Sequence, residues 1–80
     1  MEKAEILKTV NEIFINTLDD ENIVLNYGTT ANDVDEWDSL NHIQLIVAIE
    51  KWFKIRFASQ EILNWNNVGD IVNDISSKFN

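Results

Sequence analysis

Apolar side chains recur every three to four residues in several stretches of the chain, which is the spacing of an amphipathic helix. The first stretch is residues 2–18, and its expected buried stripe is Ile6, Val10, Ile13, Phe14 and Leu18. Residues 19–22, Asp-Asp-Glu-Asn, follow it, and their negative charge is unfavourable at the negative end of a helix dipole. The first helix is therefore predicted to end near Leu18.

The strongest helical pattern covers residues 39–53. Its apolar positions at helical spacing are Leu40, Ile43, Ile46, Val47, Ile49, Trp52 and Phe53, and Leu45 and Ala48 widen the stripe. Such a helix is either central to a bundle or offers a second apolar face to a partner. A short helix is predicted at 59–64 with Ser59 as its cap. The last helix is predicted at 67–79, capped by Asn67, with a buried stripe of Val68, Ile71, Val72, Ile75 and Phe79.

A connection of twenty residues, 19–38, separates the first two long helices and contains several turn-forming residues. A loop of that length in a small domain is usually functional. The residues expected to hold it to the core are Ile23, Val24, Leu25 and Trp37. A short strand at 23–25 is possible, although no pairing partner is evident. The predicted fold is an all-α bundle in one domain, residues 1–80, with three main helices, one short helix and a long first loop.

Composition and charge narrow the possible functions. The chain has 80 residues and no Cys, so disulfides and thiolate metal sites are excluded. Its formal net charge of −8 would be repelled by nucleic acid or by an anionic membrane. No apolar segment is long enough for a signal peptide or a membrane span, so we expect a cytoplasmic protein without membrane insertion.

Two catalytic or metal-binding interpretations are weak. Ser39 and His42 lie three residues apart on one helical face, but a hydrolase also needs a group that orients the histidine, an oxyanion hole and a cleft. The acids at positions 33, 35, 36 and 38 lack the spacing of a calcium loop, and no Cys/His cluster exists for zinc. We therefore expect neither catalytic residues nor a specific metal site.

Ser39 allows two interpretations. An Asp-Ser pair before an apolar run is typical of a helix N-cap, so the serine could be purely structural. A phosphate attached at a helix start would also meet free backbone N–H groups and the positive end of the helix dipole. A phosphodiester on Ser39 would thus be favourable despite the neighbouring acids.

The stretch Asp38-Ser39-Leu40, followed by Ile43, Leu45-Ile46, Ala48-Ile49-Glu50 and Phe53, resembles the acyl carrier protein family. The resemblance extends over nearly the whole chain, because the motif follows a long loop in an acidic 80-residue sequence. It implies a four-helix bundle that is not an enzyme. It also implies that Ser39 bears a covalent 4′-phosphopantetheine arm from coenzyme A, whose thiol carries acyl groups as thioesters.

The resemblance further implies roles for other residues. Those expected to meet the phosphopantetheinyl transferase and the acyl-activating, acyl-transferring or synthase enzymes are Asp38, Leu40, His42, Ile43, Val47 and Glu50. Those expected around an acyl pocket are Ile49, Ile62, Trp65 and Ile71. The chain is expected to act as a monomer.

Departures from the family pattern bear on cargo and partners. Trp37 replaces a frequent glycine, and Asn41, Gln44 and Lys51 stand where the family usually has acids. These differences favour a specialised lipid or secondary-metabolite pathway over general fatty-acid synthesis. Two alternatives stay open: an aminoacyl or peptidyl carrier, such as a D-alanyl carrier, and an unmodified helical interaction module.

Overall fold

Helices account for all the regular structure in residues 2–79, the part of the chain that the computed structural model describes. The elements are α1 (Lys3–Leu18), a 3₁₀ turn η1 (Ala31–Asp33), α2 (Ser39–Phe53), α3 (Ser59–Leu63) and α4 (Val68–Lys78). The predicted all-α bundle, with three main helices, one short helix and a long first loop, is confirmed. Residues 23–25 do not form a strand.

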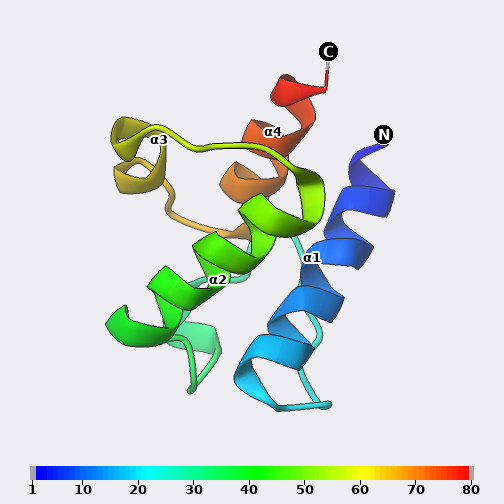
Figure 1. Ribbon diagram of the computed structural model, residues 1–80. Helices are drawn as coiled ribbons and strands as arrows, with labels where there is room; N and C mark the ends of the chain where they lie inside the picture. Colours follow the sequence, from blue (N-terminus) through cyan, green and yellow to red (C-terminus); the bar gives the residue numbers. More distant parts are fainter. Residues whose placement is uncertain (1, 80) are drawn as a thin grey trace.

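The core lies where α1 packs against both α2 and α4 (Figure 1). All five residues of the predicted α1 stripe are buried, because their spacing places them on one side of the helix. The predicted α4 stripe is buried from Val68 to Ile75. Phe79 is an exception, since it follows the end of α4, is 43% exposed and only borders the ring of Phe53, with 6.0 Å between ring centroids.

The buried face of α2 differs from the one that the simple stripe indicated. Its fully buried residues are Leu45, Ile49 and Phe53, which lie four residues apart. Leu40, Ile43, Val47 and Trp52 are exposed instead. Because apolar residues occur nearly all round this helix, its periodicity alone does not select the face that meets α1. The second apolar face considered from the sequence therefore exists.

The long first loop is held by α1 rather than by pairing with another strand. The Asn11 side chain accepts a hydrogen bond from the Leu25 N–H at 2.6 Å and donates one to the Ile23 carbonyl at 3.3 Å. Ile23, Leu25 and Trp37 are buried as predicted. Val24 is 84% exposed, so its predicted contact with the core is wrong. Between two inward-facing neighbours in extended chain, Val24 has to point outward.

The same loop is also joined to the start of α4. The Val68 N–H donates to the Thr29 carbonyl and the Gly69 N–H donates to the Tyr27 carbonyl, both at 2.8 Å. These bonds satisfy two of the backbone donors that any helix start leaves unpaired. They also fix the loop against the start of α4.

Of the helix end at Leu18 and the caps at Ser59 and Asn67 that the sequence predicts, the first and the last are confirmed. α1 ends at Leu18 because Asp19 adopts a left-handed conformation (φ 53°), and the Asn67 side chain caps α4 by accepting from the Asp70 N–H at 2.9 Å. The predicted Ser59 cap is wrong. Ala58 is the N-cap of α3, and the Glu61 carboxylate reaches back to accept from the Ala58 N–H at 2.7 Å.

Candidate functional site

The start of α2 is capped by Asp38, the residue before Ser39, and not by the serine. Asp38 is the N-cap, with extended backbone, and its Oδ1 accepts from the Asn41 N–H at 2.9 Å. Ser39 is the first helical residue and is exposed. Within residues 2–79 its hydroxyl makes no hydrogen bond. The serine therefore has no capping function, and its hydroxyl projects freely from the loop–helix junction.

The segment before Ser39 is held in place by residues of α2. The Asn41 amide donates to the Glu36 carbonyl at 2.8 Å, and the His42 N–H donates to the Asp38 carbonyl at 2.8 Å. Asn41 is thus engaged with the loop as well as with the cap. These hydrogen bonds fix the backbone on both sides of the exposed hydroxyl.

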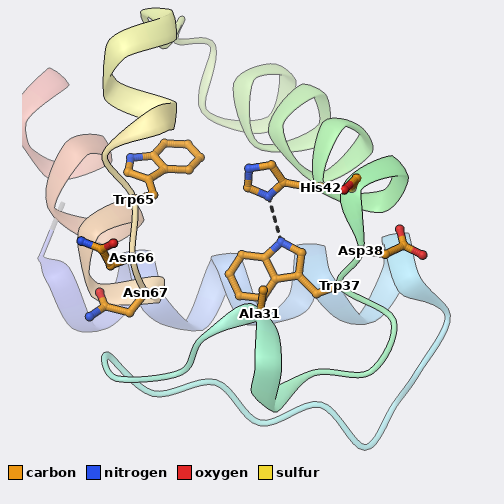
Figure 2. A pocket seen from close by; sticks show the side chains of 8 residues that line it. Ala31, Trp37, Asp38, His42, Trp65, Asn66 and Asn67 are labelled. Carbon is orange, nitrogen blue, oxygen red and sulfur yellow. Dashed lines mark hydrogen bonds between the residues drawn. The ribbon is translucent and has the colours of Figure 1, made fainter.

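A hollow of about 470 Å³ opens beside Ser39. It is bordered by η1, the start of α2 and the connection between α3 and α4, and its lining residues are Ala31, Trp37, Asp38, Ser39, His42, Trp65, Asn66 and Asn67. The rings of Trp37, His42 and Trp65 face one another across it, whereas the Asp38 carboxylate points away (Figure 2). The hollow is therefore aromatic at its walls and carries amide groups from Asn66 and Asn67.

His42 is a half-buried residue of the second turn of α2. Its Nδ1 accepts a hydrogen bond from the Trp37 indole N–H at 2.8 Å, so the proton of the neutral imidazole is on Nε2 (Figure 2). Burial lowers the pKa of His42 below its ordinary value of 6.5. The imidazole nitrogen that faces Trp37 is engaged, and no hydrogen bond joins His42 to Ser39 in the described part of the chain. A Ser–His dyad has no support in this geometry.

Aromatic rings form a continuous row, and three of them line the hollow. Phe14 meets Trp37 edge-on with 4.9 Å between ring centroids, Trp37 stacks beside His42 at 6.0 Å, and His42 meets Trp65 at 6.2 Å. Phe57 completes the row, 4.8 Å from Trp65. Such edge-to-face contacts are favourable packing arrangements of aromatic rings. Phe14 and Trp37 belong to the buried core and Phe57 and Trp65 pack against it, so the row links the walls of the hollow to the core.

The other residues considered from the sequence lie in three different environments. Leu40, Ile43 and Val47 are exposed on α2, while the Glu50 carboxylate accepts from the Phe57 N–H at 2.9 Å and anchors the α2–α3 loop. Ile49 and Ile71 are core residues, each 1% exposed. Ile62 is half-buried, and of the four expected acyl-pocket residues it is Trp65 that lines the hollow.

Sequence reasoning overlooked several residues of the hollow. Ala31 begins η1 and Asn66 lies in the connection between α3 and α4, and nothing in their local pattern points to a site; Asn67 was predicted only as the cap of the last helix. Trp37 was expected only to hold the loop. Its position two residues before Ser39 was the one available signal, since a large ring there is within reach of the serine.

Among residues 2–79 there is no group of three or more His, Cys, Asp or Glu side chains that could hold a metal ion. None of the described helices is both long and apolar enough to cross a membrane.

The comparisons with known proteins agree with this geometry. The sequence pattern of the family described as "Phosphopantetheine attachment site" matches residues 36–75, half of the chain. The acyl carrier protein of Petrotoga mobilis (strain DSM 10674 / SJ95) is 33% identical over 82 residues, which cover 100% of this chain and 94% of that protein. The chain belongs to the acyl carrier protein family.

A solved structure shows the same fold for a carrier of this family. The solution structure of holo acyl carrier protein from Geobacter metallireducens is similar to this chain with a TM-score of 0.86 and 44% sequence identity, covering 91% of this chain and 84% of that one. The chain is accordingly a carrier protein with a covalent 4′-phosphopantetheine group, and not an enzyme.

Proposed function

We propose that Ser39 is the attachment residue for 4′-phosphopantetheine and that this carrier serves a specialised pathway with short or polar acyl groups. The observation that carries the assignment is the free, exposed hydroxyl of Ser39 at the first position of α2, beside an open hollow. Asp38 caps the helix, so modification of Ser39 removes no structural hydrogen bond. The residues around Ser39 are therefore compatible with an attached 4′-phosphopantetheine group.

The chain's part in the attachment reaction is that of a nucleophile. On a phosphopantetheinyl transferase, Ser39 Oγ forms a bond to phosphorus of the coenzyme A pyrophosphate, the P–O bond to the adenosine-bearing phosphate breaks, and the hydroxyl proton passes to a base of the transferase. The phosphodiester that results lies at the start of α2, where free backbone N–H groups and the helix dipole favour negative charge. The bound arm supplies a thiol for carrying acyl groups as thioesters.

The site restricts the cargo through its aromatic walls. Phe14 and Trp37 are buried core residues, Phe57 and Trp65 pack against that core, and interiors packed at normal density leave little room for a long chain. The hollow beside Ser39, about 470 Å³ in volume, is large enough for a short acyl group. The amides of Asn66 and Asn67 on its wall also favour polar cargo, which keeps an aminoacyl carrier as the second candidate.

We further place the carrier, as a single monomeric domain, in the cytoplasm with the transferase and the acyl-handling enzymes. Tethering of the acyl group raises its effective concentration at a docked active site, which is the physical advantage of a carrier.

The test is the intact mass of the purified chain after incubation with a promiscuous phosphopantetheinyl transferase, coenzyme A and Mg²⁺. The native chain should gain one phosphopantetheine, and Ser39→Ala should gain none. Ser59→Ala is the matched control, because Ser59 is also an exposed serine at the first position of a helix, and it should be modified like the native chain. No gain by the native chain would favour the unmodified interaction module.

A further inference from the structure

An exposed apolar strip runs along α2 away from Ser39. Leu40, Ile43 and Val47 are 67%, 61% and 44% exposed, and their spacing of three and four residues places them on one side of the helix. No described part of the chain covers them. The strip is therefore available to a partner.

The strip ends in a cluster of positive charge. Val47 shares a shallow hollow of about 450 Å³ with Lys51, Lys54 and Arg56, and the same hollow is lined by Glu50 and Ile55. Lys51 lies one helical turn beyond Val47, so the positive charge continues the line of the strip. All three cations are exposed. We name Lys51, Lys54 and Arg56 the basic end of α2.

The basic end is not neutralised within the molecule. In residues 2–79 the one ion pair joins Lys78 and Glu61, which leaves Lys51, Lys54 and Arg56 without a carboxylate partner. Glu50 is the one acid of α2, and its Oε2 already accepts the Phe57 N–H. The dipole of α2 favours a cation in the last helical turn, which accounts for Lys51 but not for Arg56 beyond the helix end.

Charge is thus strongly polarised along α2. Seven of the fourteen acids in the sequence lie at 19–38, before the helix, whereas three of the six Lys and Arg residues lie at 51–56. From Ser39 to Lys54 the chain advances fifteen residues, which corresponds to about 22 Å of helix. A partner that lies along this face meets negative charge near Ser39 and positive charge at the other end.

We propose that the enzymes serving this carrier dock along α2 with an apolar groove and with an acidic patch that meets the basic end, about 20 Å from the point where they reach Ser39. The proposal rests on the proposed function, because a docked enzyme has to reach Ser39 only if Ser39 bears the phosphopantetheine arm. A compact acidic patch on a protein fits better than a membrane or a nucleic acid, because an extended anionic surface would also face the chain's net charge of −8. Complementary charge of this kind sets the encounter rate and the orientation of the partner.

The experiment compares two forms of one acyl-transferring synthase whose docking surface is basic. The first form is the natural enzyme. In the second form, the basic residues about 20 Å from the active-site entrance are replaced by Glu, whereas the basic residues at the entrance are kept. The native carrier should bind the second form about tenfold more tightly, as expected for two exposed ion pairs of up to about 1 kcal/mol each.

The carrier variants form a charge-matched pair. Lys51→Glu/Lys54→Glu should reverse the preference. Lys3→Glu/Lys8→Glu changes two exposed lysines of α1, gives the same net charge and should keep the preference. The difference should shrink when NaCl is raised from about 0.1 M to about 1 M, because the screening length falls from about 10 Å to about 3 Å. Thermal melts establish that each variant is folded.

Three results would overturn the proposal. The native carrier could bind the natural synthase as tightly as its acidic form, or the α1 variant could shift the preference as far as the α2 variant does. The native chain could instead bind phosphatidylglycerol vesicles in a manner lost in Lys51→Glu/Lys54→Glu, which would assign the basic end to a membrane. Binding is measured with both the apo and the modified chain, so a failure of Ser39 modification is recognised separately from a failure of docking.

Discussion

The division of roles between Asp38 and Ser39 leads to a quantitative prediction about stability. Asp38→Ala removes the carboxylate that accepts the Asn41 N–H at 2.9 Å and leaves this donor at the start of α2 without its cap. Replacement of a capping side chain by Ala costs about 1 kcal/mol, within a range of about 0.5–2 kcal/mol. For a domain of this size, about 1 kcal/mol corresponds to a fall in Tm of about 4–8 °C.

Ser39→Ala should behave differently, because the Ser39 hydroxyl is exposed and has no hydrogen-bond partner in the described structure. Alanine has a higher helix propensity than serine, by less than about 0.7 kcal/mol. We therefore expect the Tm of Ser39→Ala to equal or slightly exceed that of the native chain. Modification by the transferase should be lost entirely in the same variant.

The assay is thermal unfolding followed by circular dichroism on unmodified protein, with Asp38→Asn as the control. Asparagine keeps a capping oxygen and removes the charge, so its Tm should lie much closer to the native value than that of Asp38→Ala. A Tm loss in Ser39→Ala as large as that in Asp38→Ala would refute the reasoning, since it would show that the serine has a structural role at this helix end.

Three further predictions concern the loop, the histidine and the cargo. Gly69→Ala should lower stability by about 1–3 kcal/mol in urea unfolding, because its Cβ would lie 2.8 Å from the Tyr27 carbonyl oxygen, whereas Gly28→Ala, whose nearest contact is 3.5 Å, should cost much less. Because the folded-state pKa of His42 lies below 6.5, the unfolded chain takes up the proton first. The contribution of His42 to the free energy of unfolding should thus be complete above pH 6.5 and be lost as the pH falls toward the folded-state pKa. If the free energy of unfolding of His42→Gln falls with pH as steeply as that of the native chain over this window, the assignment to His42 is wrong. Short acyl groups on the arm should raise Tm more than long saturated ones, and a steady rise with chain length would contradict the aromatic barrier beside Ser39.

Local features of the chain were sufficient to predict most of the secondary structure. The stripes of α1 and α4 are one-sided, so periodicity alone identified both the helices and their buried residues up to Ile75. The Asp-Ser-Leu stretch located the start of α2, because capping preference and the onset of an apolar run are both local properties. The length of the first loop and the charge polarity along α2 were also present in the sequence.

The tertiary structure decided what depends on residues distant in sequence. Apolar residues surround α2, so only its packing against α1 determined that Leu45 and Ile49 face inward while Ile43 and Val47 stay exposed. The hollow beside Ser39 needs Trp37 and Trp65, from segments far apart in the chain, and no local pattern relates them. The choice of Asp38 over Ser39 as cap was likewise open in the sequence, because both side chains can accept the same backbone hydrogen bonds and only the backbone geometry at the loop exit distinguishes them.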